Sequence, residues 1–231
     1  EEAKDGERII SEGEVINAAG VGFAASCGIV EIPVHARPRV AIIATGSELV
    51  NPTEVPTKGK IRNSNGYAIA ACVQAAGGVP DILPAREDSL EGLKAAVSDA
   101  VRDHDFVITT GGAANGDFDF IKHVVSDLGE LLMTTVNMRP GKAQTFGIVK
   151  GTPVFGLPGN PAAAYVGFEM IIRAALRKMQ GFTHFERPHI KAKLAQDVKK
   201  NDPRRIFMRG TLRKGTDGEC TVTPAANQSS G

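Results

Sequence analysis

The residues Asp105-Phe-Val-Ile-Thr-Thr-Gly-Gly112 are the clearest indication of the fold class of this chain. Its apolar run is short and continuous, which is typical of a strand buried on both faces of a sheet. Two glycines end the run, and after a polar loop one helical face carries the apolar residues Phe118, Ile121, Val124, Val125 and Leu128. The stretch therefore predicts a strand, a glycine loop and a helix in succession.

The same succession recurs elsewhere in the chain. Val40-Ala-Ile-Ile-Ala44 precedes the loop Thr45-Gly-Ser-Glu48, and Pro153-Val-Phe-Gly156 precedes the loop Leu157-Pro-Gly-Asn-Pro161. A further strand is expected at Val79-Pro-Asp-Ile-Leu83. This alternation predicts an α/β fold of three layers, in which helices cover an open, mostly parallel sheet.

Capping residues mark the helix boundaries. Apolar side chains in residues 64–76 predict a helix that Ser64 or Asn65 is able to cap. Asp88-Ser-Leu-Glu91 resembles a capping box that opens a second helix. In Asn160-Pro161 the first residue is expected at the N-cap and the proline at the first helical position.

The distribution of apolar stretches and turn residues divides the chain into three expected regions. Residues 1–38 contain too little apolar sequence for a core of their own and are interpreted as the remnant of a preceding β-containing domain. Residues 39–183 carry the alternating strands and helices of an α/β domain. Residues 184–231 contain short β-like stretches between turns rich in Asn, Pro and Gly, which predicts a small, partial C-terminal β domain.

Composition narrows the class of function. The 231 residues are 42% hydrophobic and 23% charged, with a formal net charge of +1 and aromatic residues at only 5%. A globular protein with this balance lacks the basic footprint and stacking surfaces of a nucleic-acid binder. No apolar run is long enough to cross a membrane, and three widely spaced cysteines indicate reduced thiols. We therefore expect a cytoplasmic protein with a small-molecule ligand, without nucleic-acid or membrane partners.

Three loops follow predicted strands and are candidates for ligand binding: Thr45–Glu48, Thr109–Asp117 and Leu157–Pro161. Ligands of open parallel sheets bind beyond the carboxyl ends of the strands, so these loops are expected to converge on one crevice. Glycine-rich loops let backbone N–H groups approach an anion such as phosphate or molybdate. The alternative is that each loop is only a tight connection, and the chain has neither a P-loop nor a Gly-x-Gly-x-x-Gly motif.

Carboxylates accompany the same loops, at Glu48, Asp88, Asp117 and Asp119. A carboxylate cluster beside an anion site favours Mg²⁺, which bridges carboxylate and phosphate oxygens. The alternative assigns Asp88 and Asp117 to helix capping and leaves Glu48 as a solvated loop residue.

Basic groups are expected at the tip of a hairpin. Leu131 to Met138 and Ala143 to Val149 are predicted as two strands joined by the turn Arg139-Pro-Gly-Lys142. The Arg139 guanidinium and the Lys142 ammonium would then face an oxyanion and offset its charge. The alternative is a solvated hairpin tip whose charges only favour solubility.

Several of these segments together are similar to a known family. In order and spacing, five segments resemble signature segments of the MoeA-type molybdopterin molybdotransferases, a family that includes the gephyrin E domain: Thr45–Leu49, Asn63–Asn65, Thr110–Phe120, Met138–Lys142 and Gly156–Pro161. The resemblance covers roughly residues 5–231, and its most specific part is residues 39–181. It implies a MogA-like molybdopterin-binding fold, shared more loosely with molybdopterin adenylyltransferases and CinA-type proteins.

The resemblance implies an activity in molybdenum cofactor biosynthesis. Adenylylated molybdopterin and molybdate would bind together with Mg²⁺, molybdenum would be inserted, and AMP would be released. Catalytic and metal-binding positions would be Glu48, Asp88 and Asp119. The positions implied to bind the pterin substrate and its anionic groups are Thr45, Gly46, Ser64, Thr110, Gly111, Gly112, Asp117, Arg139, Lys142, Pro158, Gly159, Asn160 and Pro161. Segments at Arg204–Arg209 and Gln228-Ser229 also match anion-site segments of the family.

The chain also departs from the family pattern. Thr135 stands where the family often has a basic residue, and a lobe that the family supplies from the partner subunit of a homodimer is expected to precede residue 1. The sequence is therefore interpreted as a fragment of a larger, dimeric enzyme. Two alternatives stay open at this point: a molybdopterin adenylyltransferase-like enzyme, and a non-catalytic module that binds molybdopterin or peptides.

Overall fold

A six-stranded sheet forms the centre of the fold in a computed structural model that describes residues 3–86, 89–111 and 120–228. The strand order across the sheet is β4-β1-β5-β9-β8-β6. Four adjacent strands run parallel to one another: β4 (Val79–Arg86), β1 (Arg39–Thr45), β5 (Phe106–Gly111) and β9 (Thr152–Leu157). Two antiparallel strands complete one side: β6 (Glu130–Thr135) and β8 (Ala143–Val149). The predicted mostly parallel sheet is thus confirmed.

The central strands are buried because helices cover both of their faces. Every residue of Val40–Thr45 is buried, as are Phe106–Thr110. The strands β1, β5 and β9 are consecutive in the sheet and run in the same direction, so they end at the same edge. The three loops that follow them start from this edge.

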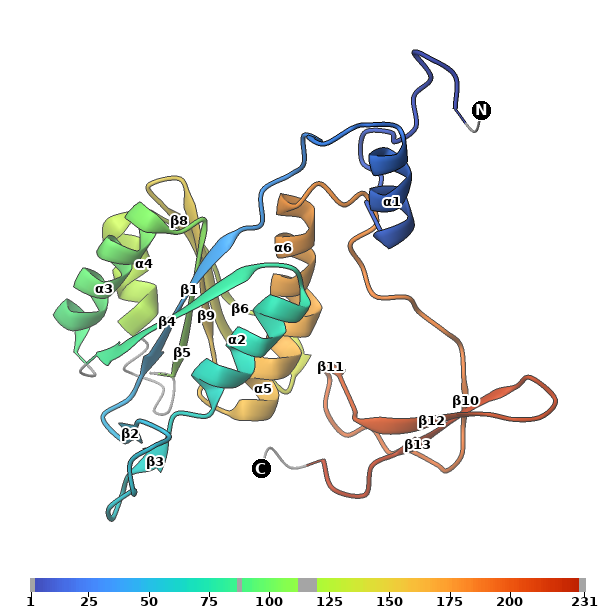
Figure 1. The fold of residues 1–231 in the computed structure, drawn as a ribbon. Helices are drawn as coiled ribbons and strands as arrows, with labels where there is room; N and C mark the ends of the chain where they lie inside the picture. The colour runs from blue at the N-terminus through green and yellow to red at the C-terminus, as the bar shows by residue number, and fades with distance from the viewer. Residues whose placement is uncertain (1–2, 87–88, 112–119, 229–231) are drawn as a thin grey trace.

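The helices form two layers, one on each face of the sheet (Figure 1). On one face lie α3 (Leu90–Asp103) and α4 (Phe120–Leu128). On the other lie α2 (Asn65–Ala75), α5 (Pro161–Gly167), a π-helical turn (Phe168–Ile172) and α6 (Arg173–Met179). Their apolar faces pack on the sheet as the helical spacing predicts, which confirms the three-layer α/β fold.

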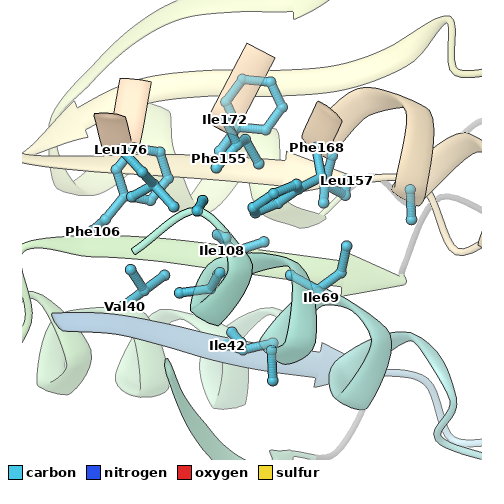
Figure 2. Close-up of a cluster of buried hydrophobic side chains, with 14 residues drawn as sticks. Val40, Ile42, Ile69, Phe106, Ile108, Phe155, Leu157, Phe168, Ile172 and Leu176 are labelled. Carbon is cyan, nitrogen blue, oxygen red and sulfur yellow. The ribbon is translucent and has the colours of Figure 1, made fainter. Parts of the chain in front are cut away.

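Figure 2 shows the core between the sheet and the second helical layer. Ile42 of β1, Ile108 of β5 and Phe155 of β9 face Ile69 of α2 and Phe168 of the π-helical turn. All five side chains are at most 2% exposed. Burial of apolar surface at this site fixes how α2 and the α5–α6 helix lie relative to the strand ends.

Ile69→Val tests this packing. Removing one buried methylene group is expected to lower the free energy of unfolding by about 0.5–1.5 kcal/mol, because the neighbouring side chains fill the space only partly. Ile61→Val is the matched control, since Ile61 is 57% exposed and Ile69 only 1%. Urea unfolding of both variants gives the difference, and equal stability losses would contradict the assigned core.

Two caps differ from the sequence prediction. Ser64 occupies the N-cap position of α2, but its side chain makes no capping hydrogen bond. The side-chain Oδ1 of Asn63 accepts the hydrogen bond from the Gly66 N–H instead, at 2.9 Å. Ser89 is the N-cap of α3, and its hydroxyl accepts from the Gly92 N–H at 3.1 Å. A capping side chain one residue away from the expected one satisfies the helix start equally well.

The predicted hairpin of Leu131–Met138 and Ala143–Val149 needs a correction. The first strand ends at Thr135, and Met138–Arg139 form a separate strand, β7, which pairs with β11 (Arg205–Ile206) instead of β8. The Arg205 N–H donates to the Asn137 carbonyl, and the Phe207 N–H donates to the Arg139 carbonyl. Met138 and Arg139 thus pair with a strand of the C-terminal region and do not extend the pairing of β6 with β8.

Outside the sheet, the regular elements are short. The C-terminal region forms a three-stranded sheet of β10 (Lys193–Leu194), β13 (Cys220–Pro224) and β12 (Gly210–Lys214), and β2 (Leu49–Val50) pairs with β3 (Ile61–Arg62) beyond β1. Residues 3–38 contain the helix α1 (Ala18–Ser26) and no strand. None of the described helices is long and apolar enough to cross a membrane.

Candidate functional site

A pocket of 1240 Å³ opens at the edge of the sheet where β1, β5 and β9 end. Its first wall comes from those strand ends, with Glu48, Gly111 and the loop Pro158–Pro161. Its second wall is the turn Arg139–Ala143 between β7 and β8. The third wall comes from the C-terminal region, with Arg204, Phe207, Arg209 and Gln228. Segments far apart in the sequence therefore share one cavity.

Glycines allow the strand ends to approach closely. Gly111 has a φ of +111°, and a Cβ atom at this position would lie 1.9 Å from the Thr45 carbonyl oxygen. A Cβ atom on Gly159 would lie 3.5 Å from the Gly111 Cα, which is ordinary contact distance. The end of β5 and the loop after β9 therefore lie close together, and only glycine fits at position 111.

An amide side chain that was not among the predicted site residues joins the same loops. The Nδ2 of Asn65, the first residue of α2, donates to the Thr110 Oγ1 at 3.0 Å and to the Gly159 carbonyl at 2.8 Å. The Gly159 carbonyl only accepts hydrogen bonds, so the orientation of the amide is fixed. Asn65 thus links α2 to the ends of both β5 and β9.

The start of α5 is built as the sequence predicts. Asn160 is the N-cap, and its Oδ1 accepts from the Ala163 N–H at 3.1 Å. Pro161 occupies the first turn of the helix, where its missing N–H costs no hydrogen bond. This cap sets the position of the Pro158–Pro161 wall.

The described lining of the pocket is strongly basic. Four cationic side chains line it, Arg139, Lys142, Arg204 and Arg209, against one carboxylate, that of Glu48. Guanidinium and ammonium groups that converge on one cavity favour an anionic ligand, because each offers charge-assisted hydrogen bonds to oxyanion oxygens. The arrangement is suited to phosphate or molybdate.

A half-buried carboxylate holds two of these cations in place. Asp202 accepts from the Arg204 Nε at 2.8 Å and from the Arg139 Nη1 at 3.1 Å, and its side chain is 10% exposed. The Arg204 guanidinium holds the pKa of the Asp202 carboxyl well below its ordinary value; the Arg204 N–H and then Arg139 add to the shift. Asp202 therefore ties the C-terminal wall to the Arg139–Ala143 wall.

Asp202→Asn tests this link through pH. A carboxyl whose pKa is lowered in the folded state stabilises the fold above its unfolded pKa of about 3.9, and this stabilisation is lost as the pH falls towards the folded pKa. At pH 7 the variant is thus expected to melt at a lower temperature than the wild type. The difference between the two melting temperatures is expected to shrink as the pH falls below about 4.

Asp99→Asn provides the control for that series. Asp99 accepts from Arg102 within one helix, and both side chains are more than half exposed, so its loss is expected to have little effect at any pH. Indistinguishable melting curves for Asp202→Asn and the wild type at pH 7 would rule out the link.

The structure brings together about half of the predicted site residues. The predicted residues that line the pocket are Glu48, Gly111, Arg139, Lys142, Pro158, Gly159, Asn160 and Pro161. Thr45, Gly46 and Thr110 are buried behind the lining, and Ser64 is exposed outside it. Asp88, Gly112, Asp117 and Asp119 lie outside the described residues.

The linking roles of two residues could not be predicted from local motifs. Asn65 was a capping candidate within the family-like segment Asn63–Asn65, and Asp202 carried no motif, but both act by bridging segments distant in sequence. The similarity of Arg204–Arg209 and Gln228 to anion-site segments was the one signal for the third wall. Among the described residues, no group of three or more acidic, His or Cys side chains is arranged to bind a metal.

Known families match most of the chain. Residues 41–178 match the family described as probable molybdopterin binding domain, and residues 191–231 match the MoeA C-terminal region, domain IV. Relatives named molybdopterin molybdenumtransferase are 38% identical in Staphylococcus aureus (strain COL) and 37% identical in Staphylococcus epidermidis (strain ATCC 12228 / FDA PCI 1200). Each match covers 100% of this chain and 55% of the relative, so the chain spans about half the length of the curated relatives it matches.

Solved structures agree with this assignment. The crystal structure of a molybdopterin biosynthesis MoeA protein from Pyrococcus horikoshii superposes with a TM-score of 0.79 at 29% identity, over 95% of this chain and 53% of that one. A second MoeA structure, from Pyrococcus horikoshii OT3, has a TM-score of 0.77 at 24% identity, over 100% of this chain and 55% of that chain, which shows the shared fold. The chain belongs to the molybdopterin-binding family, in the MoeA-type form that carries the MoeA C-terminal region after the binding domain.

Proposed function

We propose that this chain carries the pterin- and oxyanion-binding part of a molybdopterin molybdotransferase. The reaction would insert molybdenum from molybdate into adenylylated molybdopterin and release AMP. The observation that carries this proposal is the pocket itself, in which three sheet-edge loops meet four cationic side chains. Both substrates are anions, and the relatives named molybdopterin molybdenumtransferase support the identity of the pterin.

The proposed role of the basic residues is electrostatic. Cleavage of the phosphoanhydride leaves negative charge on the AMP phosphate, and molybdate is itself a dianion. Arg139, Lys142 and Arg204 line the same cavity, so they would offset this charge without any proton transfer. Gly111 and Gly159 have no side chains, so the pterin phosphate would approach the backbone of both loops.

Glu48 fits the proposed Mg²⁺ because carboxylate and phosphate oxygens are the ligands that this ion prefers. One carboxylate does not form a complete site, and we propose Asp88 and Asp119 as the further ligands. When bound, Mg²⁺ would supply Lewis-acid polarisation of the phosphoanhydride. Glu48 lines the same pocket as the four cationic side chains. Its proposed role is to place a carboxylate beyond the end of β1, where it would bind the metal ion.

The proposal extends to the intact protein. We propose that it is a cytoplasmic homodimer in which a neighbouring subunit completes the active site. The C-terminal wall of the pocket favours the molybdotransferase over an adenylyltransferase-like enzyme, because Arg204 and Arg209 come from the region that matches MoeA domain IV. The three-region domain division is likewise proposed as 1–38, 39–183 and 184–231.

A stepwise titration tests the proposed function. Adenylylated molybdopterin is added to the protein first, and molybdate with Mg²⁺ second, while bound pterin and free AMP are measured. Binding followed by AMP release is the expected result. Binding without release would instead indicate a pterin-binding module, and consumption of ATP with free molybdopterin would indicate an adenylyltransferase.

A further inference from the structure

Asn65 joins three elements through one amide group. Its Nδ2 donates two hydrogen bonds, to the Thr110 hydroxyl at the end of β5 and to the Gly159 carbonyl after β9. The amide nitrogen carries two hydrogens, and each of them makes one of these hydrogen bonds. Thr110 is 1% exposed, whereas Gly159 lines the pocket. The contact therefore connects a buried strand end to the pocket wall.

The position of Gly159 decides the shape of that wall. Gly159 immediately precedes Asn160, which caps α5, and a Cβ atom on Gly159 would lie 3.5 Å from the Gly111 Cα. Both Gly111 and Pro158–Pro161 line the cavity. Displacing the Gly159 carbonyl would therefore shift the loop Pro158–Pro161 relative to Gly111 within the first wall of the pocket.

We propose that Asn65 is a positioning residue that holds the end of β5 and the loop after β9 together and so sets the binding geometry of the pocket. It does not line the pocket itself, so it acts through Thr110 and Gly159. The inference rests on the proposed function for the identity of the ligand, while the link between the loops is measurable without any ligand.

Asn65→Asp is the most informative variant. Its size is nearly unchanged, but a carboxylate has no N–H to donate, and its oxygens would face the Gly159 carbonyl oxygen. Hydrogen exchange of the ligand-free chain is expected to rise about tenfold at residues 157–163 and 109–111, the effect of losing one to two hydrogen bonds. Exchange in β1 is expected to stay unchanged, because its residues are held by the buried core.

Gln180→Ala is the matched control. The Gln180 amide also donates to two carbonyls, those of Ala76 at 3.0 Å and Leu176 at 2.9 Å, but it does so at the opposite end of α2. In the Gln180→Ala variant, amide hydrogen exchange is expected to rise only around Ala76 and at the end of α6. A rise at residues 157–163 in Gln180→Ala equal to that in Asn65→Asp would overturn the positioning role, since any loosening of α2 would then suffice.

Ligand binding completes the test. The dissociation constant of adenylylated molybdopterin is expected to rise about tenfold in Asn65→Asp and to stay unchanged in Gln180→Ala. If Asn65→Asp does not fold, Thr110→Val removes one of the two hydrogen bonds at constant side-chain size and is expected to raise exchange at residues 109–111. Unchanged hydrogen exchange at residues 109–111 and 157–163 in the folded variants overturns the inference. A wild-type chain that binds no pterin, with faster loop exchange in Asn65→Asp, refutes the proposed function and supports the positioning role.

Discussion

Gly111→Ala is expected to lower the free energy of unfolding by about 2–5 kcal/mol and to abolish pterin binding. Two separate costs add up at this position. A left-handed φ of +111° is unfavourable for alanine by about 1–2 kcal/mol. The new Cβ would also lie 1.9 Å from the Thr45 carbonyl oxygen, and relieving this backbone clash adds about 1–3 kcal/mol. Denaturant unfolding and pterin titration measure the two effects.

Gly151→Ala separates those costs. Gly151 has a φ of +84° in the turn between β8 and β9, and a Cβ there would meet no atom within 4 Å. The substitution thus carries the conformational cost of about 1–2 kcal/mol without the clash, and pterin binding is expected to be retained. If the two variants lose the same stability, β1 and β5 do not approach each other as described.

Glu48→Gln is expected to reduce AMP release about 10²–10³-fold in the intact protein, because it removes a proposed ligand of the Mg²⁺ that would stabilise negative charge in the transition state. The change preserves the size of the side chain and removes the one negative charge in the described pocket lining. Asp119→Ala is expected to abolish AMP release in the intact protein, with the fold preserved. Steady-state AMP release with saturating molybdate and Mg²⁺ is the measurement.

Glu54→Gln is the control for this charge change. Glu54 lies in the same segment after β1 but outside the pocket, and its side chain accepts a hydrogen bond from the Asn51 N–H. Its AMP release is therefore expected to match that of the wild type. A Glu48→Gln enzyme that retains wild-type turnover would remove Glu48 from the catalytic assignment.

Local patterns were sufficient to predict the layers of the fold. Val40–Ala44 is continuously apolar because both faces of β1 are covered, and the spacing of Leu93, Val97 and Ala100 matches the buried side of α3. The same reasoning placed the three loops at one edge, because parallel neighbouring strands end together. These features depend on short-range periodicity, which a single sequence contains.

Long-range pairing was not predictable in this way. The sequence predicted Met138–Arg139 as the end of a long strand. In the structure these residues pair with β11, a strand of the C-terminal region. The roles of Asn65 and Asp202 depend on partners that are close only in the folded chain. The proposed roles of Asp88 and Asp119 stay predictions, since both lie outside the described residues.

The central claim is that the pocket at the ends of β1, β5 and β9 binds the phosphorylated pterin. Hydrogen exchange with and without adenylylated molybdopterin measures this directly. Protection is predicted at Gly111, at Asn160–Ala163 and at Gly141–Lys142, all of which line the pocket. Protection confined to the separate cavity lined by residues 10–16 and 32–35, with the pocket unchanged, would contradict the account.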